Sequence, residues 1–279
     1  MNIPPRIIDF HVHLFPDRLF DAVWNYFSSR YGQDVIYKMY YRDCIKYLRE
    51  RGVDKIVYSN YAHREGVAGP LNDWNVRILN DEPDLYCFAA YHPGDAGALS
   101  MAERILDHPR VLGFKLQLLV QRFYPHDARL YSMYDMAMER NKRILFHAGT
   151  GPVGNEFVGL AEFRKLLKQR PSLAANVAHM GAYEYGGFMD LLDDHPGLYL
   201  DTAFVFFREM QGRGGFDLGN EALEKHGNRI VYGSDFPNLV LPRESEIETL
   251  LGFNLPQEFY DRVFYSNGME LISDASLKK

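Results

Sequence analysis

The first strand of the chain reads Arg6-Ile7-Ile8-Asp9-Phe10-His11-Val12-His13-Leu14-Phe15-Pro16. Its apolar run leads into two histidines one residue apart, and alternate side chains of a strand point to the same face. We therefore expect His11 and His13 to leave the strand end side by side. Neutral imidazole is a common ligand of zinc and related ions, so the pair predicts half of a metal site. A chance pair on a surface strand is the alternative, and the rest of the chain must decide between them.

Strand and helix signals alternate along the rest of the chain, which favours a parallel sheet. Eight strand units favour a closed barrel, so we predict an α/β protein with the (β/α)8 TIM barrel fold, a single domain over residues 1–279. A doubly wound open sheet is the alternative, but no glycine-rich phosphate loop opens the first helix. After the first strand, we expect strands at 53–60, 85–91, 111–118, 143–147, 173–179, 197–202 and 229–234, and helices at 71–80, 98–106, 127–140, 160–168, 188–193 and 220–226.

Residues 17–41 form an aromatic-rich insertion directly after the histidine strand. We expect a lid or pocket wall there, with a helical hairpin packed only for stability as the alternative. Asp43 and Asp127 are expected to cap helices. The segment 244–279 is expected to be helical and to pack on the outside of the barrel.

The composition is that of an ordinary globular protein, with 47% hydrophobic residues and a net charge of −6. This charge gives no basic surface for nucleic acid and no reason to expect binding to anionic lipid. Cys44 and Cys87 lie in unrelated segments, so they predict neither a disulfide framework nor a metal site. With no leader-like segment and no long apolar run, we expect a protein of the cytoplasm that acts on a small molecule. The oligomeric state is left open, a homodimer included.

Polar side chains gather at the predicted carboxyl ends of several strands, where barrel enzymes carry out their chemistry. Each of these side chains also has a purely structural explanation, such as a histidine that hydrogen-bonds to the backbone or a lysine that pairs with a carboxylate. Together these explanations would need several coincidences at equivalent positions, so a metal-dependent site is favoured. The residues are His11 and His13 on strand one, Lys115 on strand four, His147 on strand five, His179 on strand six and Asp235 on strand eight.

The same positions carry motifs that resemble the amidohydrolase superfamily, and within it the amidohydrolase 2 branch, which includes decarboxylases of the aminocarboxymuconate-semialdehyde type. The resemblance runs nearly end to end. It rests on Asp9-Phe10-His11-Val12-His13, Asn72-Asp73-Trp74, His92-Pro93-Gly94-Asp95, Gly113-Phe114-Lys115-Leu116, His147-Ala148-Gly149-Thr150, His179-Met180-Gly181, Gly233-Ser234-Asp235-Phe236-Pro237 and Ser266-Asn267-Gly268.

The resemblance implies that His11, His13, His147 and Asp235 bind one divalent metal, expected to be zinc. Such an ion lowers the pKa of a bound water from about 15.7 toward 7. Asp235 would take the proton of the attacking water and pass it to the leaving group, and His179 would polarise the substrate oxygen. Lys115 has two interpretations: a plain lysine facing an anionic substrate, or a carbamylated lysine that bridges two metal ions.

Arginines in the loops after strands four and seven could bind a substrate carboxylate in bidentate fashion, namely Arg122, Arg208 and Arg213. Solvated surface arginines are the plainer interpretation. His63 follows strand two and could also reach the pocket.

The favoured hypothesis is a hydrolase that cleaves an ester, lactone or amide of a small acid, which could be aromatic. A metal-dependent, non-oxidative decarboxylase of the same fold is the first alternative. A metal-stabilised binding module without turnover is the second, and a phosphoesterase is disfavoured because the chain offers too few further metal ligands.

Overall fold

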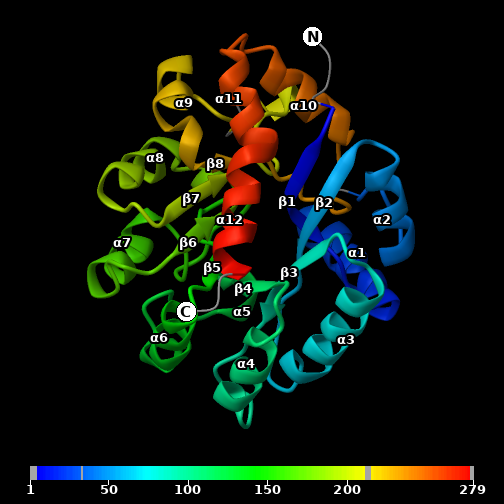
Figure 1. Cartoon of the computed structure of the whole chain (residues 1–279), viewed down its shortest axis with the longest axis vertical. Helices are drawn as coiled ribbons and strands as arrows, with labels where there is room; N and C mark the ends of the chain where they lie inside the picture. Colours follow the sequence, from blue (N-terminus) through cyan, green and yellow to red (C-terminus); the bar gives the residue numbers. More distant parts are fainter. Residues whose placement is uncertain (1–4, 33, 211–214, 277–279) are drawn as a thin grey trace.

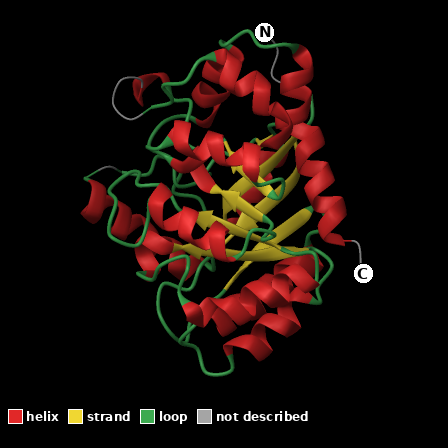
Figure 2. Cartoon of the chain, turned by 90° about the vertical axis from the view of Figure 1, so that its left-hand side faces the viewer, coloured by secondary structure: helices red, strands yellow, loops and turns green. Residues whose placement is uncertain are grey.

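The computed structural model describes residues 5–32, 34–210 and 215–276. Eight strands form one sheet in which each pairs in parallel with the next along the chain. Helices surround the strands (Figures 1 and 2), so the predicted (β/α)8 barrel is confirmed. The strands are β1 (Ile7–His13), β2 (Val53–Ser59), β3 (Leu85–Ala90), β4 (Val111–Gln117), β5 (Arg143–His147), β6 (Ala175–Val177), β7 (Leu198–Asp201) and β8 (Ile230–Val231).

The barrel closes between β1 and the segment that follows β8. Phe10 N–H donates to the carbonyl of Tyr232, and Asp235 N–H donates to the carbonyl of His11, each at 2.8 Å. A parallel bridge between Val12 and Phe236 continues this pairing. The closing segment therefore carries Asp235 alongside the histidine strand.

Most of the predicted helices are present within a few residues of their expected bounds. The helices are α1 (Asp17–Tyr31), α2 (Tyr41–Arg49), α3 (Ala68–Asp81), α4 (Ala98–Leu106), α5 (Leu118–Gln121), α6 (Tyr131–Glu139), α7 (Leu160–Gln169), α8 (Tyr185–Asp194), α9 (Asn220–His226), α10 (Arg243–Leu251), α11 (Gln257–Asp261) and α12 (Asn267–Ser276). None of the helices in the described ranges combines the length and apolar composition that a membrane span requires.

Several local predictions need correction. Helix α2 starts two residues before Asp43, which therefore lies in its first turn and is not its cap. Asp127 does cap a helix, because its side chain accepts the Arg129 N–H, but that helix is a short 3-10 turn (Ala128–Leu130) that precedes α6. Strands β6 and β8 are shorter than predicted, since the chain turns sharply after each to place polar side chains at the barrel mouth.

The last helix, α12, covers the end of the barrel and does not pack along its flank (Figure 1). Its Leu271, Ile272 and Ala275 join an apolar cluster inside the barrel that includes Phe10 on β1 and Phe88 on β3. Because α12 closes the end at which the strands begin, the opposite end is the one left for a site.

Candidate metal centre

A bulge in β1 turns the two histidines into the barrel. The register against β2 shifts by one residue between Asp9 and Val12, so β1 carries one extra residue there. Phe10, at the start of the shifted stretch, belongs to the apolar cluster inside the barrel. Strict alternation would direct His11 to the opposite face, whereas one extra residue reverses the alternation. Phe10 and His11 are adjacent in sequence, yet both side chains therefore point into the barrel.

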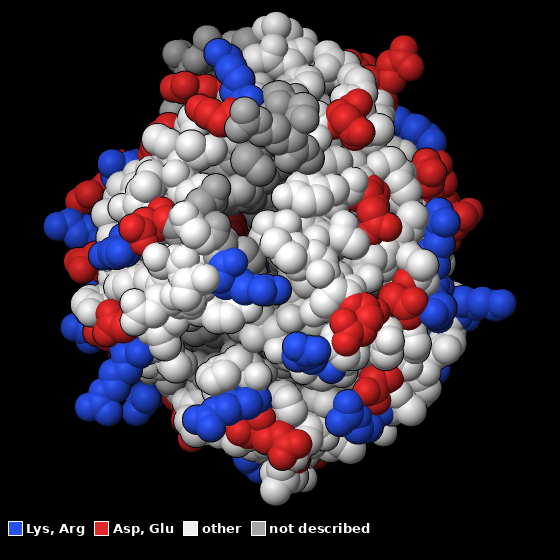
Figure 3. All heavy atoms as spheres, turned by 180° about the vertical axis from the view of Figure 1, so that it is seen from behind, with Lys and Arg blue, Asp and Glu red and all other residues white. Residues whose placement is uncertain are grey.

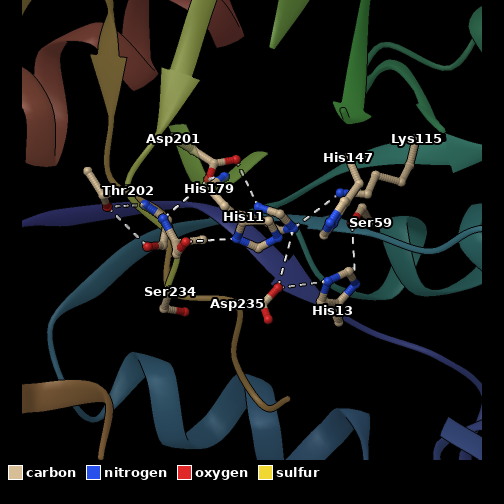
Figure 4. Close-up of polar contacts among 12 residues, drawn as sticks. His11, His13, Ser59, Lys115, His147, His179, Asp201, Thr202, Ser234 and Asp235 are labelled. Atoms are coloured by element: carbon tan, nitrogen blue, oxygen red, sulfur yellow. Dashed lines mark hydrogen bonds and ion pairs between the residues drawn. The ribbon is translucent and has the colours of Figure 1, made fainter. Parts of the chain in front are cut away.

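His11, His13 and Asp235 form a compact group of donor atoms (Figure 4). His13 Nε2 lies 3.0 Å and His11 Nε2 3.5 Å from Asp235 Oδ1. All three residues are buried, and their donor atoms lie within 4.8 Å of one another. Gly233 permits this approach, because a Cβ at that position would lie 2.5 Å from the Cβ of His11. The predicted convergence of strands one and eight is therefore present in the structure.

Asp201, at the end of β7, holds the other ring nitrogen of His11. Its Oδ2 lies 2.8 Å from His11 Nδ1, and its Oδ1 accepts the backbone N–H groups of His179 at 2.8 Å and Ala203 at 3.2 Å. A carboxylate can only accept here, so Nδ1 carries the proton and Nε2 keeps a lone pair that a metal ion can use. A carboxylate behind a metal-binding histidine fixes both its tautomer and its orientation.

Sequence reasoning did not select Asp201, although it ends a strand in the same way as the residues that were selected. Burial raises its pKa to about 6, and the neighbouring His179 and Lys115 only partly offset this rise. The backbone N–H groups of His179 and Ala203 and the nearby Lys115 keep the pKa of Asp201 from rising further.

Lys115 lies below the donor group, deep in the barrel. Its Nζ is 3.3 Å from His11 Nε2 and its side chain is fully buried. Burial lowers its pKa to about 8, with Asp201 and Asp235 acting in the opposite direction. Lys115 does not belong to the cavity lining in the described part of the chain, so it contacts the ligand group and not an open substrate space.

His179 stands beside the donor group and has one ring nitrogen engaged. Its Nδ1 lies 2.7 Å from the carbonyl of Ala203, so Nδ1 donates and Nε2 is left for a ligand or substrate. His179 also combines with His11 and Asp201 in a second group of potential metal ligands. Its backbone has φ 58°, in the sharp turn that follows β6.

His147 is placed differently from its expected role as a metal ligand. Its Nε2 lies 2.9 Å from the Gly151 carbonyl and its Nδ1 lies 3.2 Å from Gln117 Nε2. With both nitrogens engaged, His147 does not join His11, His13 and Asp235, although its ring centroid is only 4.8 Å from that of His179. Its role as a ligand stays a prediction.

The pKa shifts of His11 and Asp235 suit the binding of a cation. Burial lowers the pKa of His11 well below its ordinary value, and Lys115 adds to this effect. Burial alone would raise the pKa of Asp235, but the hydrogen bond from His13 and the His13 and His179 imidazoles lower it overall. Ligands must be deprotonated to bind a metal ion, and a neutral imidazole beside an ionised carboxylate meets that requirement. Two imidazoles and one carboxylate suit zinc or manganese by their chemistry.

The donor group opens into a cavity of about 600 Å³. His13, His147, His179 and Asp235 line one part of it, and His63 also reaches it as expected. Seen from behind, the surface has a hollow near the middle, bordered largely by uncharged residues (Figure 3). Parallel strands of a barrel direct their carboxyl ends to such a mouth.

The predicted substrate arginines are not brought to this cavity. Arg122 and Arg208 are exposed, and neither belongs to its lining among the described residues. Arg122 instead lies 3.7 Å from Glu156 and near the ring of Phe157. Arg213 lies outside the described residues. Arg30 on α1, which sequence reasoning did not select, lines the cavity instead.

Comparison with known proteins gives a family and a fold. The family model described as amidohydrolase matches residues 8–272. No curated protein matches the chain. Among solved structures, an uncharacterised TIM-barrel protein of Bordetella bronchiseptica is 16% identical with a TM-score of 0.72, over 98% of this chain and 100% of that chain.

Two further structures have assigned activities in their descriptions. A probable 2-pyrone-4,6-dicarboxylic acid hydrolase of Acinetobacter baumannii, with citric acid bound, is 15% identical with a TM-score of 0.63, over 96% of this chain and 99% of that chain. A dihydroxybenzoic acid decarboxylase of Polaromonas, with manganese and the inhibitor 2-nitroresorcinol bound, is 13% identical with a TM-score of 0.69, over 98% of this chain and 97% of that chain. At these identities the likeness shows the fold alone.

Proposed function

The chain belongs to the amidohydrolase family, and on that premise we propose that it is a metal-dependent hydrolase of a carboxylic ester, lactone or amide. The observation that carries the proposal is the buried group of His11, His13 and Asp235 at the edge of a large cavity, with Asp201 behind His11. Asp235 belongs both to this group and to the cavity lining, as expected where a ligand group also acts on a substrate. We propose that the site binds one metal ion, expected to be zinc. His147 would be a further ligand once its ring turns away from Gly151.

A divalent ion held by these residues would lower the pKa of a bound water and polarise a substrate carbonyl. The chain's own residues then move the proton. Asp235 lines the cavity and its pKa is lowered, so it is ionised and able to accept a proton from the attacking water. The proton then passes to the leaving group, which departs as the neutral alcohol or amine.

His179 is placed to assist at the substrate oxygen. Because Nδ1 donates to Ala203, only Nε2 is available to the cavity, and a protonated Nε2 would donate to the oxygen on which charge develops. Lys115 contacts His11 and lies outside the cavity lining, so we assign it to the support of the ligand group and not to substrate binding. A cytoplasmic location and the oligomeric state stay predictions.

Decarboxylation is the second candidate, because a structure with the same fold is described as a decarboxylase with manganese bound. That reaction requires a group that delivers a proton to the carbon that loses carbon dioxide. The lowered pKa of Asp235 leaves it ionised, so it carries no proton to deliver to that carbon, which favours hydrolysis.

The test supplies phenyl acetate, γ-butyrolactone and 2,6-dihydroxybenzoate to the zinc- or manganese-loaded protein in ¹⁸O-labelled water. Hydrolysis predicts one labelled oxygen in the product acid. Release of carbon dioxide without label in the product selects decarboxylation. Asp235→Asn, prepared in parallel, controls for contaminating esterases, and equal turnover by this variant contradicts the proposal.

A further inference from the structure

One face of α1 forms a wall of the cavity. Counted from Leu19, the other residues of α1 that line the cavity follow three, four, seven, eight and eleven positions later, which is the spacing of one helix face. Phe20 and Trp24, between them in sequence, are buried in the core and hold the helix in place. The lining residues of α1 are Leu19, Ala22, Val23, Tyr26, Phe27 and Arg30.

This wall starts at the donor group and leads away from it. Three residues separate β1 from α1, and Phe15 in that connection stacks on His13 with ring centroids 6.0 Å apart. From Leu19 to Arg30 an α-helix rises about 16 Å. Arg30 therefore lies at the far end of α1, well separated from His13.

The walls of the cavity are mainly apolar. Outside α1, the apolar lining includes Leu119, Val120, Pro152, Val153 and Val240. Within the described lining, Arg30 is the only lysine or arginine and Asp235 the only carboxylate. Such walls match an apolar molecule, whereas a small acid with several carboxylates would leave most of the space unfilled and find a single arginine.

We propose that the substrate is an elongated, mainly apolar molecule whose reacting acyl group lies at His13 and Asp235 and whose far end carries an anionic group that pairs with Arg30. This proposal rests on the proposed function for the position of the reacting group. It replaces the small acid expected from sequence by one that fills the length of α1. Arg30, Ala22 and Val23 then determine specificity, since they contact the substrate away from the reacting bond.

The test is a calorimetric titration with butyrate, decanoate and decanedioate, which share a carboxylate and differ in chain length and in the second charge. Each buried methylene strengthens binding about fourfold at best, so decanoate should bind at least about tenfold more tightly than butyrate. Ala22→Trp narrows the cavity beside α1. It should remove the gain in affinity for decanoate, while the affinity for butyrate stays within about twofold of the wild-type value. Equal affinities for butyrate and decanoate overturn the apolar part of the proposal.

The far-end charge is tested with a matched pair of arginine variants on the same helix. Arg30→Gln should weaken decanedioate about three- to fivefold, the range of an exposed ion pair. Arg18→Gln removes an exposed arginine of α1 that does not belong to the described lining, and it should change nothing. Equal effects of the two variants on decanedioate overturn the assignment of Arg30.

Each titration is run on protein treated with a chelator and on the same protein reloaded with zinc. A wrong metal assignment appears as an affinity for butyrate that zinc does not change. A wrong substrate shape appears as the loss of chain-length dependence in both preparations, so the two failures are distinguishable.

Discussion

The two ends of the barrel interior carry opposite chemistry, although the same strands build both. At the end covered by α12, Phe10, Phe88 and Leu271 belong to an apolar cluster. At the other end, His11, His13 and Asp235 form a buried polar group beside the cavity. On β1 the change occurs between adjacent residues, at the bulge after Asp9. Stability and chemistry are thus separated along the barrel axis, and substitutions at the two ends should have different readouts.

The largest expected effect is on turnover at the polar end. Asp235→Asn keeps the size of the side chain but removes the anionic ligand and the proton acceptor. We expect a loss of at least about 10³-fold in kcat, which corresponds to roughly 4 kcal/mol of activation free energy. Steady-state assays on the best ester should measure it, with circular dichroism as the control for folding. A kcat of Asp235→Asn within tenfold of the wild-type value would contradict a catalytic role for the polar end of the barrel.

The next effect is on stability at the apolar end. Leu271→Ala on α12 removes a side chain that is 2% exposed and packs inside the barrel. It should lower the free energy of unfolding by about 2 to 5 kcal/mol, because it leaves a cavity. Urea denaturation measures the loss, while the metal content of the folded variant should stay that of the wild type. Loss of metal from folded Leu271→Ala would show that the two ends are not independent.

The outline of this separation was predictable from sequence, because it depends on patterns. Apolar runs gave all eight strands, and polar residues at their carboxyl ends gave His11, His13 and Asp235. The bulge in β1 was not predictable, since alternation alone keeps Phe10 and His11 on opposite faces. Asp201 could have been selected, because it is a polar residue at the carboxyl end of a strand. Its role, however, depends on a contact with His11 across the barrel.

The predictions for loop arginines illustrate what the sequence lacks. Whether Arg122 or Arg30 reaches the cavity depends on how loops and α1 fold back over the barrel mouth, and no local pattern encodes that. Arg122 lies near Glu156 and Phe157, whereas Arg30 follows the helical face that lines the cavity. The orientation of His147 toward Gly151 is equally a matter of tertiary contacts.

A smaller effect should follow from the support of His11. Asp201→Asn removes the negative charge behind Nδ1 while retaining the size of the side chain. We expect metal affinity to fall about 10- to 100-fold, the range for carboxylates that orient a metal-binding histidine. Competition with a chromophoric chelator measures it. Unchanged affinity would show that His11 is positioned without Asp201.

The smallest expected effect concerns Lys115, a cation buried at the boundary between the two ends. Burial lowers its pKa from 10.5 to about 8, so the folded protein binds this proton less tightly than the unfolded chain. Stability is therefore lost as the pH falls from 10.5 toward 8, and the loss is complete at pH 7. Lys115→Met should raise the free energy of unfolding of the metal-free protein at pH 7 by about 1 to 2 kcal/mol.

Urea denaturation at pH 7 and pH 10 checks the direction of this pH dependence. The difference between Lys115→Met and the wild type should shrink at pH 10, where the buried lysine is neutral in the folded state. A difference that is the same at both pH values would contradict the titration of Lys115 as its cause.

The metal content per chain shows whether His11, His13 and Asp235 build a metal centre. Protein purified without chelator would be measured by elemental analysis beside folded Asp235→Asn and Leu271→Ala. We expect about one equivalent of a divalent transition metal in the wild type and in Leu271→Ala, and a large loss in Asp235→Asn. A wild-type protein that holds no metal, even after dialysis against zinc or manganese, would contradict it.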